Sequence, residues 1–277
     1  MTTRTLTVAI AQIATGAEPD KNLDKVLRSI RSAAARGARI VLLPEASLVR
    51  FGVDPAPFAE ALDGPWAKAI SEAARELGVI VLVGTFTPGD DGRVRNTILV
   101  TGEGIHDGYD KIHLYDAYGF SESADVQPGD TPFVFDVDGI TVGVATCYDV
   151  RFPELFRDLV DKGAEVVLVT AHWGAGAGKV DAWRLLNRAR AVDTTTWIVA
   201  CDQADASTTG IIEPSGPRFG VGHSLVVSPM GEVQHELDDH EDELVYTLDM
   251  SAAERARTVI PVLANRRLGI AAHQGTR

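Results

Sequence analysis

Apolar strand segments that alternate with helical segments restrict the fold of this chain more than any other sequence feature. The first half has the order β-α-β-α-β-β, and the second half repeats it. In the first half we expect strands at 6–13, 39–46, 79–86 and 96–104, and helices at 22–37 and 66–78. In the second half we expect strands at 140–147, 164–171, 196–202 and 223–229, and helices at 153–163 and 180–194. The repeated order indicates an internal duplication, and the apolar spacing predicts a mixed α/β fold.

The layering follows from the strands, because continuous apolar strands need cover on both faces. Helices can cover one face of each sheet if the two sheets also pack together. A four-layer α-β-β-α sandwich satisfies every expected strand. No Pro/Gly/Ser-rich linker divides residues 1–277, so we expect one domain. The region after 244 adds a strand and a helix, and a C-terminal tail is expected from about 265.

The overall charge and the cysteines exclude several classes of protein. The formal net charge of the 277 residues is −13, which argues against nucleic acid and anionic membranes as partners. No apolar stretch is long enough for a transmembrane helix, and the N-terminus lacks the apolar core of a signal peptide. The two cysteines, Cys147 and Cys201, each end a strand-like run and do not suggest a disulfide framework. We therefore expect a cytoplasmic, reducing location.

Cys147 lies where an apolar strand ends, just before a helical segment that begins at Pro153. A strand, a tight turn and a helix form the geometry of a nucleophile elbow. Proline fits the first turn of a helix, and the nearby helix N-terminus is expected to favour a thiolate. The alternative interpretation is a small side chain that only fills the core. Cys201 is expected to do that.

A cysteine nucleophile needs a proton acceptor. None of the seven histidines has a recognisable protease context. Glu45 lies at the end of an apolar strand, where a carboxylate is costly unless it has a role or a partner. Lys111 follows a polar turn and could stabilise both a thiolate and a developing oxyanion. The alternatives are a glutamate and a lysine that reach solvent. No cluster of residues has metal-ligand spacing.

Three segments together carry a family resemblance: LLPEAS at 42–47, YDKIHLYD at 109–116 and TCYDVRFPELFR at 146–157. In order and spacing they resemble the Glu, Lys and Cys motifs of the nitrilase superfamily of carbon–nitrogen hydrolases. Further similar segments are AQ at 11–12, RNT at 95–97, the region 120–130 and the helix 183–195. The sequence around the cysteine is most similar to that of the Nit-type ω-amidases and deaminated-glutathione amidases. True nitrilases usually have Trp after the nucleophile, and this chain has Tyr148.

The resemblance implies site residues as well as the αββα sandwich. Glu45 resembles the general base, Lys111 the charge stabiliser and Cys147 the nucleophile, while Glu122 lies where many members have a second active-site glutamate. The backbone N–H of Tyr148 would join Lys111 in binding the oxyanion. The resemblance also implies no metal and no organic cofactor, and a homodimer or larger homo-oligomer.

The substrate pocket is expected to include three more residues, His172, Trp173 and Arg151. The segment 171–183 lies where the family lines its pocket, but it is glycine-rich and departs from the usual wording. Arg151 could bind a substrate carboxylate, or it could stabilise the elbow by pairing with Glu154 or another carboxylate, and we favour the second role.

The resemblance, together with these residues, implies an amidohydrolase that cleaves the C–N bond of a small carboxylated amide through a cysteine thioester. The products would be ammonia and a carboxylic acid. An N-carbamoyl amino acid or β-ureidopropionate-type hydrolase would share the same three residues and is the alternative. An inactive scaffold of the same fold is a third possibility, against which the intact Glu45, Lys111 and Cys147 argue.

Overall fold

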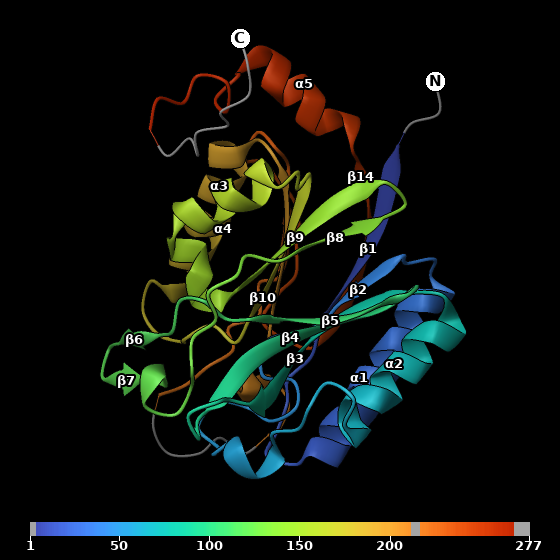
Figure 1. Cartoon of the computed structure of the whole chain (residues 1–277), viewed down its shortest axis with the longest axis vertical. Helices are drawn as coiled ribbons and strands as arrows, with labels where there is room; N and C mark the ends of the chain where they lie inside the picture. The colour runs from blue at the N-terminus through green and yellow to red at the C-terminus, as the bar shows by residue number, and fades with distance from the viewer. Residues whose placement is uncertain (1–3, 212–216, 269–277) are drawn as a thin grey trace.

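Two six-stranded sheets lie face to face between two pairs of helices (Figure 1). The computed structural model describes residues 4–211 and 217–268. The first sheet has the order β14-β1-β2-β3-β4-β5. Its strands are β1 (Thr5–Gln12), β2 (Ile40–Leu42), β3 (Ile80–Pro88), β4 (Val94–Gly102), β5 (Ile105–Asp110) and β14 (Asp242–Asp249). Helices α1 (Pro19–Ala35) and α2 (Pro65–Leu77) cover its outer face.

The second sheet has the order β13-β12-β11-β10-β9-β8. Its strands are β8 (Val134–Val137), β9 (Ile140–Thr146), β10 (Val166–Ala171), β11 (Trp197–Asp202), β12 (Leu225–Val227) and β13 (Val233–Glu236). Helices α3 (Pro153–Asp161) and α4 (Lys179–Thr194) cover its outer face, and α5 (Ser251–Val259) follows β14 (Figure 1). A short hairpin, β6 (Asp116–Ala117) and β7 (Phe120–Ser121), connects the halves. The predicted four-layer α-β-β-α sandwich is confirmed.

The two sheets have the same internal topology. In the first, β1, β2 and β3 are parallel, and β4 and β5 continue antiparallel. In the second, β9, β10 and β11 are parallel, and β12 and β13 continue antiparallel. One antiparallel strand completes each, β14 beside β1 and β8 beside β9. This equivalence supports the duplication inferred from the order of elements.

Local sequence explains why the helices form and which face they bury. Helix α2 begins at Pro65, whose fixed φ suits a first turn, and ends at Gly78 in the left-handed conformation. Its buried residues Trp66, Ile70 and Ala74 recur every four positions. They pack against the first sheet, in an apolar cluster that includes Val81 of β3. A separate apolar cluster, drawn from both sheets, fills the space between them. Among the residues described, no helix combines the length and apolar character that crossing a bilayer requires.

Besides the two-residue strands β6 and β7, three edge strands of the two six-stranded sheets were not expected from the sequence. Strand β5 reads IHDGYD, which alternates weakly and is partly exposed, and β8 and β13 have four residues each. The predicted C-terminal strand and helix are β14 and α5. Most of the expected tail, 269–277, lies outside the described residues. At the start of that tail Arg266 pairs with Asp161 of α3 at 2.5 Å.

Candidate active site

Four loops that follow strands meet at one end of the two sheets. Cys147 follows β9 directly, His172 follows β10, and Glu45 lies three residues after β2. Lys111 follows the antiparallel strand β5. Because the carboxyl ends of parallel strands meet at one edge, the topology brings these side chains together. Glu122, at the start of the 3₁₀ turn η2 (Glu122–Ala124), reaches the same place.

The turn around Cys147 is strained and rigidly held. The φ of Cys147 is +49°, a left-handed value that non-glycine residues rarely adopt and that often marks functional sites. Thr146 and Asp149 form a reciprocal capping box at the start of η3 (Cys147–Arg151). The Asp149 carboxylate also accepts hydrogen bonds from the Tyr109 hydroxyl at 2.6 Å and from the main-chain N–H of His113 at 3.0 Å. The elbow predicted from sequence is therefore present, with Asp149 as its anchor.

Glu45 is fully buried and accepts three hydrogen bonds. Its Oε1 accepts from Lys111 Nζ and from Asn96 Nδ2, each at 2.8 Å. Its Oε2 accepts from the main-chain N–H of His172 at 2.8 Å. Burial raises the pKa of Glu45 above its usual value, although the Lys111 charge opposes the shift. A carboxylate with a raised pKa and a fixed geometry is suited to accept and return a proton.

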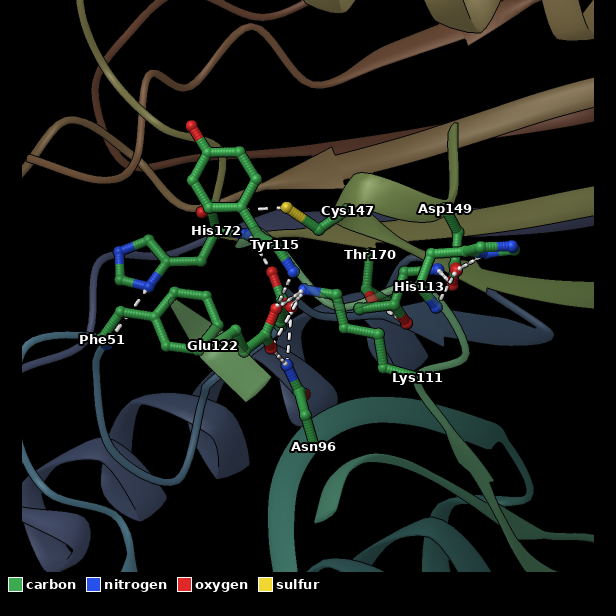
Figure 2. Close-up of polar contacts among 12 residues, drawn as sticks. Phe51, Asn96, Lys111, His113, Tyr115, Glu122, Cys147, Asp149, Thr170 and His172 are labelled. Carbon is green, nitrogen blue, oxygen red and sulfur yellow. Dashed lines mark hydrogen bonds and ion pairs between the residues drawn. The ribbon is translucent and has the colours of Figure 1, made fainter. Parts of the chain in front are cut away.

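Lys111 lies between two carboxylates. Its ammonium is 2.8 Å from Glu45 Oε1 and 2.9 Å from Glu122 Oε2, and all three side chains are buried. Burial lowers the pKa of Lys111, but Glu122 and Glu45 outweigh it and hold the pKa well above its usual value. Glu122 also accepts from Asn96 and from the main-chain N–H of Tyr115 (Figure 2). The site therefore contains a permanent cation held in a fixed position.

The Cys147 thiol lies in the same cluster. Its Sγ is 4.0 Å from the main-chain oxygen of His172 (Figure 2). The main-chain N–H of the same residue donates to Glu45. Burial and the nearby Glu45 charge raise the pKa of Cys147 well above its usual value, and Lys111 opposes this only in part. The expectation that a helix N-terminus would favour a thiolate is wrong, because desolvation dominates. A buried neutral thiol needs a base before it can attack.

A small cavity opens onto the thiol. Its lining includes residues expected from sequence, namely Lys111, Cys147, Arg151, His172 and Trp173, and others that were missed, namely Phe51, Tyr115, Gly174, Lys179 and Phe219. The His172 imidazole stacks on Phe51 with ring centroids 5.2 Å apart, and Figure 2 shows it turned away from the sulfur. Burial lowers the pKa of His172 well below its usual value, so the ring is neutral at pH 7.

Arg151 points into this cavity, and the favoured pairing with Glu154 is wrong. Among the described residues Arg151 makes no ion pair or hydrogen bond. Its guanidinium carbon lies 5.4 Å from the Trp173 ring centroid and 5.9 Å from the Tyr148 ring centroid. Stacking on aromatic faces holds the guanidinium while leaving its donors available. The structure thus favours the alternative, a group that can bind a carboxylate.

Asn96 was missed as a site residue, although the segment that contains it contributed to the resemblance. Its amide bridges Glu45 and Glu122 and so keeps two like charges on either side of Lys111. An asparagine directly before the apolar run of strand β4 was the available signal, because a buried amide needs partners. Within the ranges described, no group of three or more His, Cys, Asp or Glu side chains could hold a metal ion.

The fold and this buried Glu–Lys–Cys cluster define a carbon–nitrogen hydrolase. Residues 7–258 match the family model described as carbon-nitrogen hydrolase, and the chain belongs to that family. It is 44% identical to the hydrolase Rv0480c of Mycobacterium tuberculosis over 94% of this chain and 95% of the relative. It is 33% identical to the omega-amidase NIT2-B of Xenopus laevis over 89% of each chain.

A solved structure is similar as well. It is a mutant of the amidase from Nesterenkonia sp. AN1, in which the acetamide moiety of fluoroacetamide is added covalently at the active-site cysteine. The TM-score is 0.76 at 26% identity, covering 95% of this chain and 94% of that one. Family membership and these amidase relatives support an enzyme that hydrolyses amide C–N bonds.

Proposed function

We propose that this protein is an amidase that cleaves small carboxylated amides through a thioester on Cys147. The observation that carries the proposal is the position of Lys111, held between Glu45 and Glu122 in the cavity that contains the thiol. The cluster supplies a nucleophile, a base and a fixed cation, which are the groups that acyl transfer needs. The covalent cysteine adduct of the Nesterenkonia amidase supports the same role for Cys147.

In the first half-reaction Glu45 accepts the thiol proton as Cys147 Sγ attacks the amide carbonyl. The carbonyl oxygen becomes an oxyanion, which the Lys111 ammonium and the backbone N–H of Tyr148 stabilise. Tyr148 lies in the first turn of η3, where helical geometry leaves N–H groups without a carbonyl partner. Glu45 then returns the proton to the nitrogen as the C–N bond breaks, and ammonia leaves with the acyl group on sulfur.

In the second half-reaction Glu45 takes a proton from water as the water oxygen attacks the thioester carbonyl. The same donors stabilise the second oxyanion. The C–S bond breaks, Glu45 returns the proton to the sulfur, and a carboxylic acid leaves. Glu122 takes no proton in this scheme. It fixes Lys111 through two contacts, at 3.1 and 2.9 Å, and so acts on the reaction through the oxyanion donor.

Arg151 supports a substrate with a carboxylate. It is a cation in the cavity wall with no carboxylate partner in the part of the chain that the structure describes, and an omega-amidase is among the relatives. A planar guanidinium forms two parallel hydrogen bonds to a carboxylate. The acid group of the amide would then lie beside the Trp173 and Tyr148 rings that contact Arg151.

A panel of amides, carbamoyl compounds and nitriles tests the proposal, with ammonia release as the readout. It should include succinamate, α-ketoglutaramate and deaminated glutathione. We expect ammonia from the carboxylated amides, and an acyl adduct on Cys147 by mass spectrometry after acid quench. Carbon dioxide released with the ammonia would instead indicate the carbamoyl hydrolase. An enzyme whose Cys147 reacts with thiol reagents but which turns over no member of the panel would contradict the proposal.

We also propose a homodimer, or a larger homo-oligomer, and a cytoplasmic location. Leu185 and Val192 of α4 and the nearby Met230 are exposed at 66%, 47% and 47%. Large apolar side chains that share one surface support a protein interface there. Light scattering should give at least twice the mass of one chain, and Leu185→Glu should reduce it. Both cysteines are buried and unpaired, which supports a reducing compartment.

A further inference from the structure

Lys179 is a second cation in the wall of the catalytic cavity. It begins α4, directly after the glycine-rich turn 174–178. Its ammonium donates to the Tyr115 hydroxyl at 3.3 Å and lies 3.8 Å from the Tyr118 ring centroid. Both partners are neutral, so these contacts hold the side chain without compensating its charge.

Arg151 is close enough to affect it. The pKa of Lys179 is lowered by burial and then by the Arg151 charge, and a negative sulfur at Cys147 acts in the opposite sense. In the residues described, neither cation has a carboxylate within ion-pair distance. The remaining cation of the cavity, Lys111, is already held by Glu45 and Glu122. Within the described part of the chain, this side of the cavity therefore carries two positive charges without a counterion.

The stability of α4 does not explain why its first residue is a lysine. The N-terminus of a helix carries a partial positive charge, so a lysine in the first turn is unfavourable there. Helix α4 has sixteen residues, and Lys179 is its first. Residues that oppose a local preference are expected where function requires them.

Open space beside Lys179 is created by Gly174. A Cβ at this position would lie 3.7 Å from the Tyr115 hydroxyl and 3.9 Å from Lys179 Nζ, which is ordinary contact distance. Gly174 and Lys179 both line the cavity, and the glycine leaves the space beside the ammonium free of a side chain. The segment 171–183, whose sequence departs from the usual family sequence, thus supplies both the Lys179 cation and the glycine next to it.

We propose that Lys179 is a specificity-determining residue that binds, together with Arg151, the carboxylate at the far end of the amide substrate. This inference rests on the proposed amidase function and adds a residue that decides which amides are accepted. Arg151 supplies a planar pair of donors, and Lys179 supplies a compact charge on the other side of the carboxylate. A neutral amide of equal length would leave both cations without a counterion.

The test compares two substrates that differ only in the distal group, succinamate with a carboxylate and succinamide with a neutral amide. The enzymes are wild type, Lys179→Met, Lys179→Arg and the control Lys68→Met, which removes an exposed lysine of α2. For Lys179→Met we expect kcat/KM on succinamate to fall on the order of tenfold or more, mainly through KM. The value on succinamide should stay within about twofold, and Lys179→Arg should keep much of the succinamate activity.

Equal losses on both substrates, or no loss on succinamate, would overturn the role of Lys179 while leaving the amidase intact. A loss in Lys68→Met as large as in Lys179→Met would overturn it too, since net charge would then be the cause. Wild-type enzyme that cleaves neither amide would overturn the proposed function, and this inference with it.

Discussion

Replacing Glu45 with glutamine distinguishes a catalytic role from a structural one, because the acylation rate and the stability should change by different amounts. The hydrogen bonds of this carboxylate determine the size of both changes. Oε1 accepts from Lys111 and Asn96, and Oε2 accepts from the N–H of His172. All three partners are donors. A glutamine side chain has one oxygen and one NH₂ group, so its NH₂ must face a donor whichever way the amide is turned.

The structural cost of Glu45→Gln follows from that conflict. One buried N–H loses its acceptor, which costs about 1–3 kcal/mol. For a chain of about this size, each kcal/mol lowers the melting temperature by roughly 2–4 °C. The catalytic cost is larger, because an amide cannot accept the thiol proton. Acylation should fall by about 10²–10⁴-fold, the usual contribution of a general base.

The assay measures single-turnover acylation and the melting temperature on the same preparation. Glu236→Gln is the control, because Glu236 is a partly buried carboxylate that accepts from Arg184 at 2.7 Å and from His223 at 2.9 Å, outside the cavity. The control should lose stability and keep its acylation rate. If Glu45→Gln acylates at nearly the wild-type rate, Glu45 is not the base, whatever its melting temperature.

Three further predictions follow from the structure. Cys147→Ala should lower turnover by at least about 10³-fold with an unchanged circular dichroism spectrum. Cys201→Ala should stay active, because the Cys201 thiol donates to the main-chain oxygen of Ala11 in the core; the opposite ranking would refute the assignment. Burial raises the pKa of Asp202 from 3.8 to about 8, so the folded state keeps a proton that the unfolded state releases. Stability should fall as pH rises through that window, and urea unfolding should show a smaller fall in Asp202→Asn; equal slopes would contradict this. Gly84→Ala would place a Cβ 2.4 Å from the Ala46 nitrogen. It should cost about 1–3 kcal/mol and slow acylation by moving the neighbouring Glu45; a wild-type melting temperature with full acylation would show that the loop adapts.

The central strands and the main helices could be predicted because their signals are local. Strand β10 reads VVLVTA and is buried at every position, and α3 begins at a proline. The edge strand β13 reads VQHE and is mostly exposed, so its apolar content does not distinguish it from a loop. Its pairing with β12 depends on the position of β12 in the sheet, which the four residues of β13 do not indicate.

The candidate site was predicted in part for the same reason. Glu45, Lys111 and Cys147 each end a recognisable strand and carry motif wording, so sequence alone could name them. Arg151 was assigned to the wrong partner because a carboxylate three residues away is visible in sequence, whereas the Trp173 ring that it contacts is brought near only by the fold. Lys179 gave no signal, since a lysine at the start of a helix is usually solvated.

The pairing of β1 with β14 has a consequence for how the chain is synthesised. Thr5 pairs with Asp249 and Gln12 with Asp242, so β1 is translated long before the strand that completes its pairing. All the proposed catalytic residues emerge well before β14 does. Until it arrives, β1 presents an unpaired edge, the kind of surface that recruits other chains. A nascent chain arrested after β13 would thus possess all the proposed catalytic residues and still be liable to aggregate. Its handling by chaperones would depend on the time taken to translate β14.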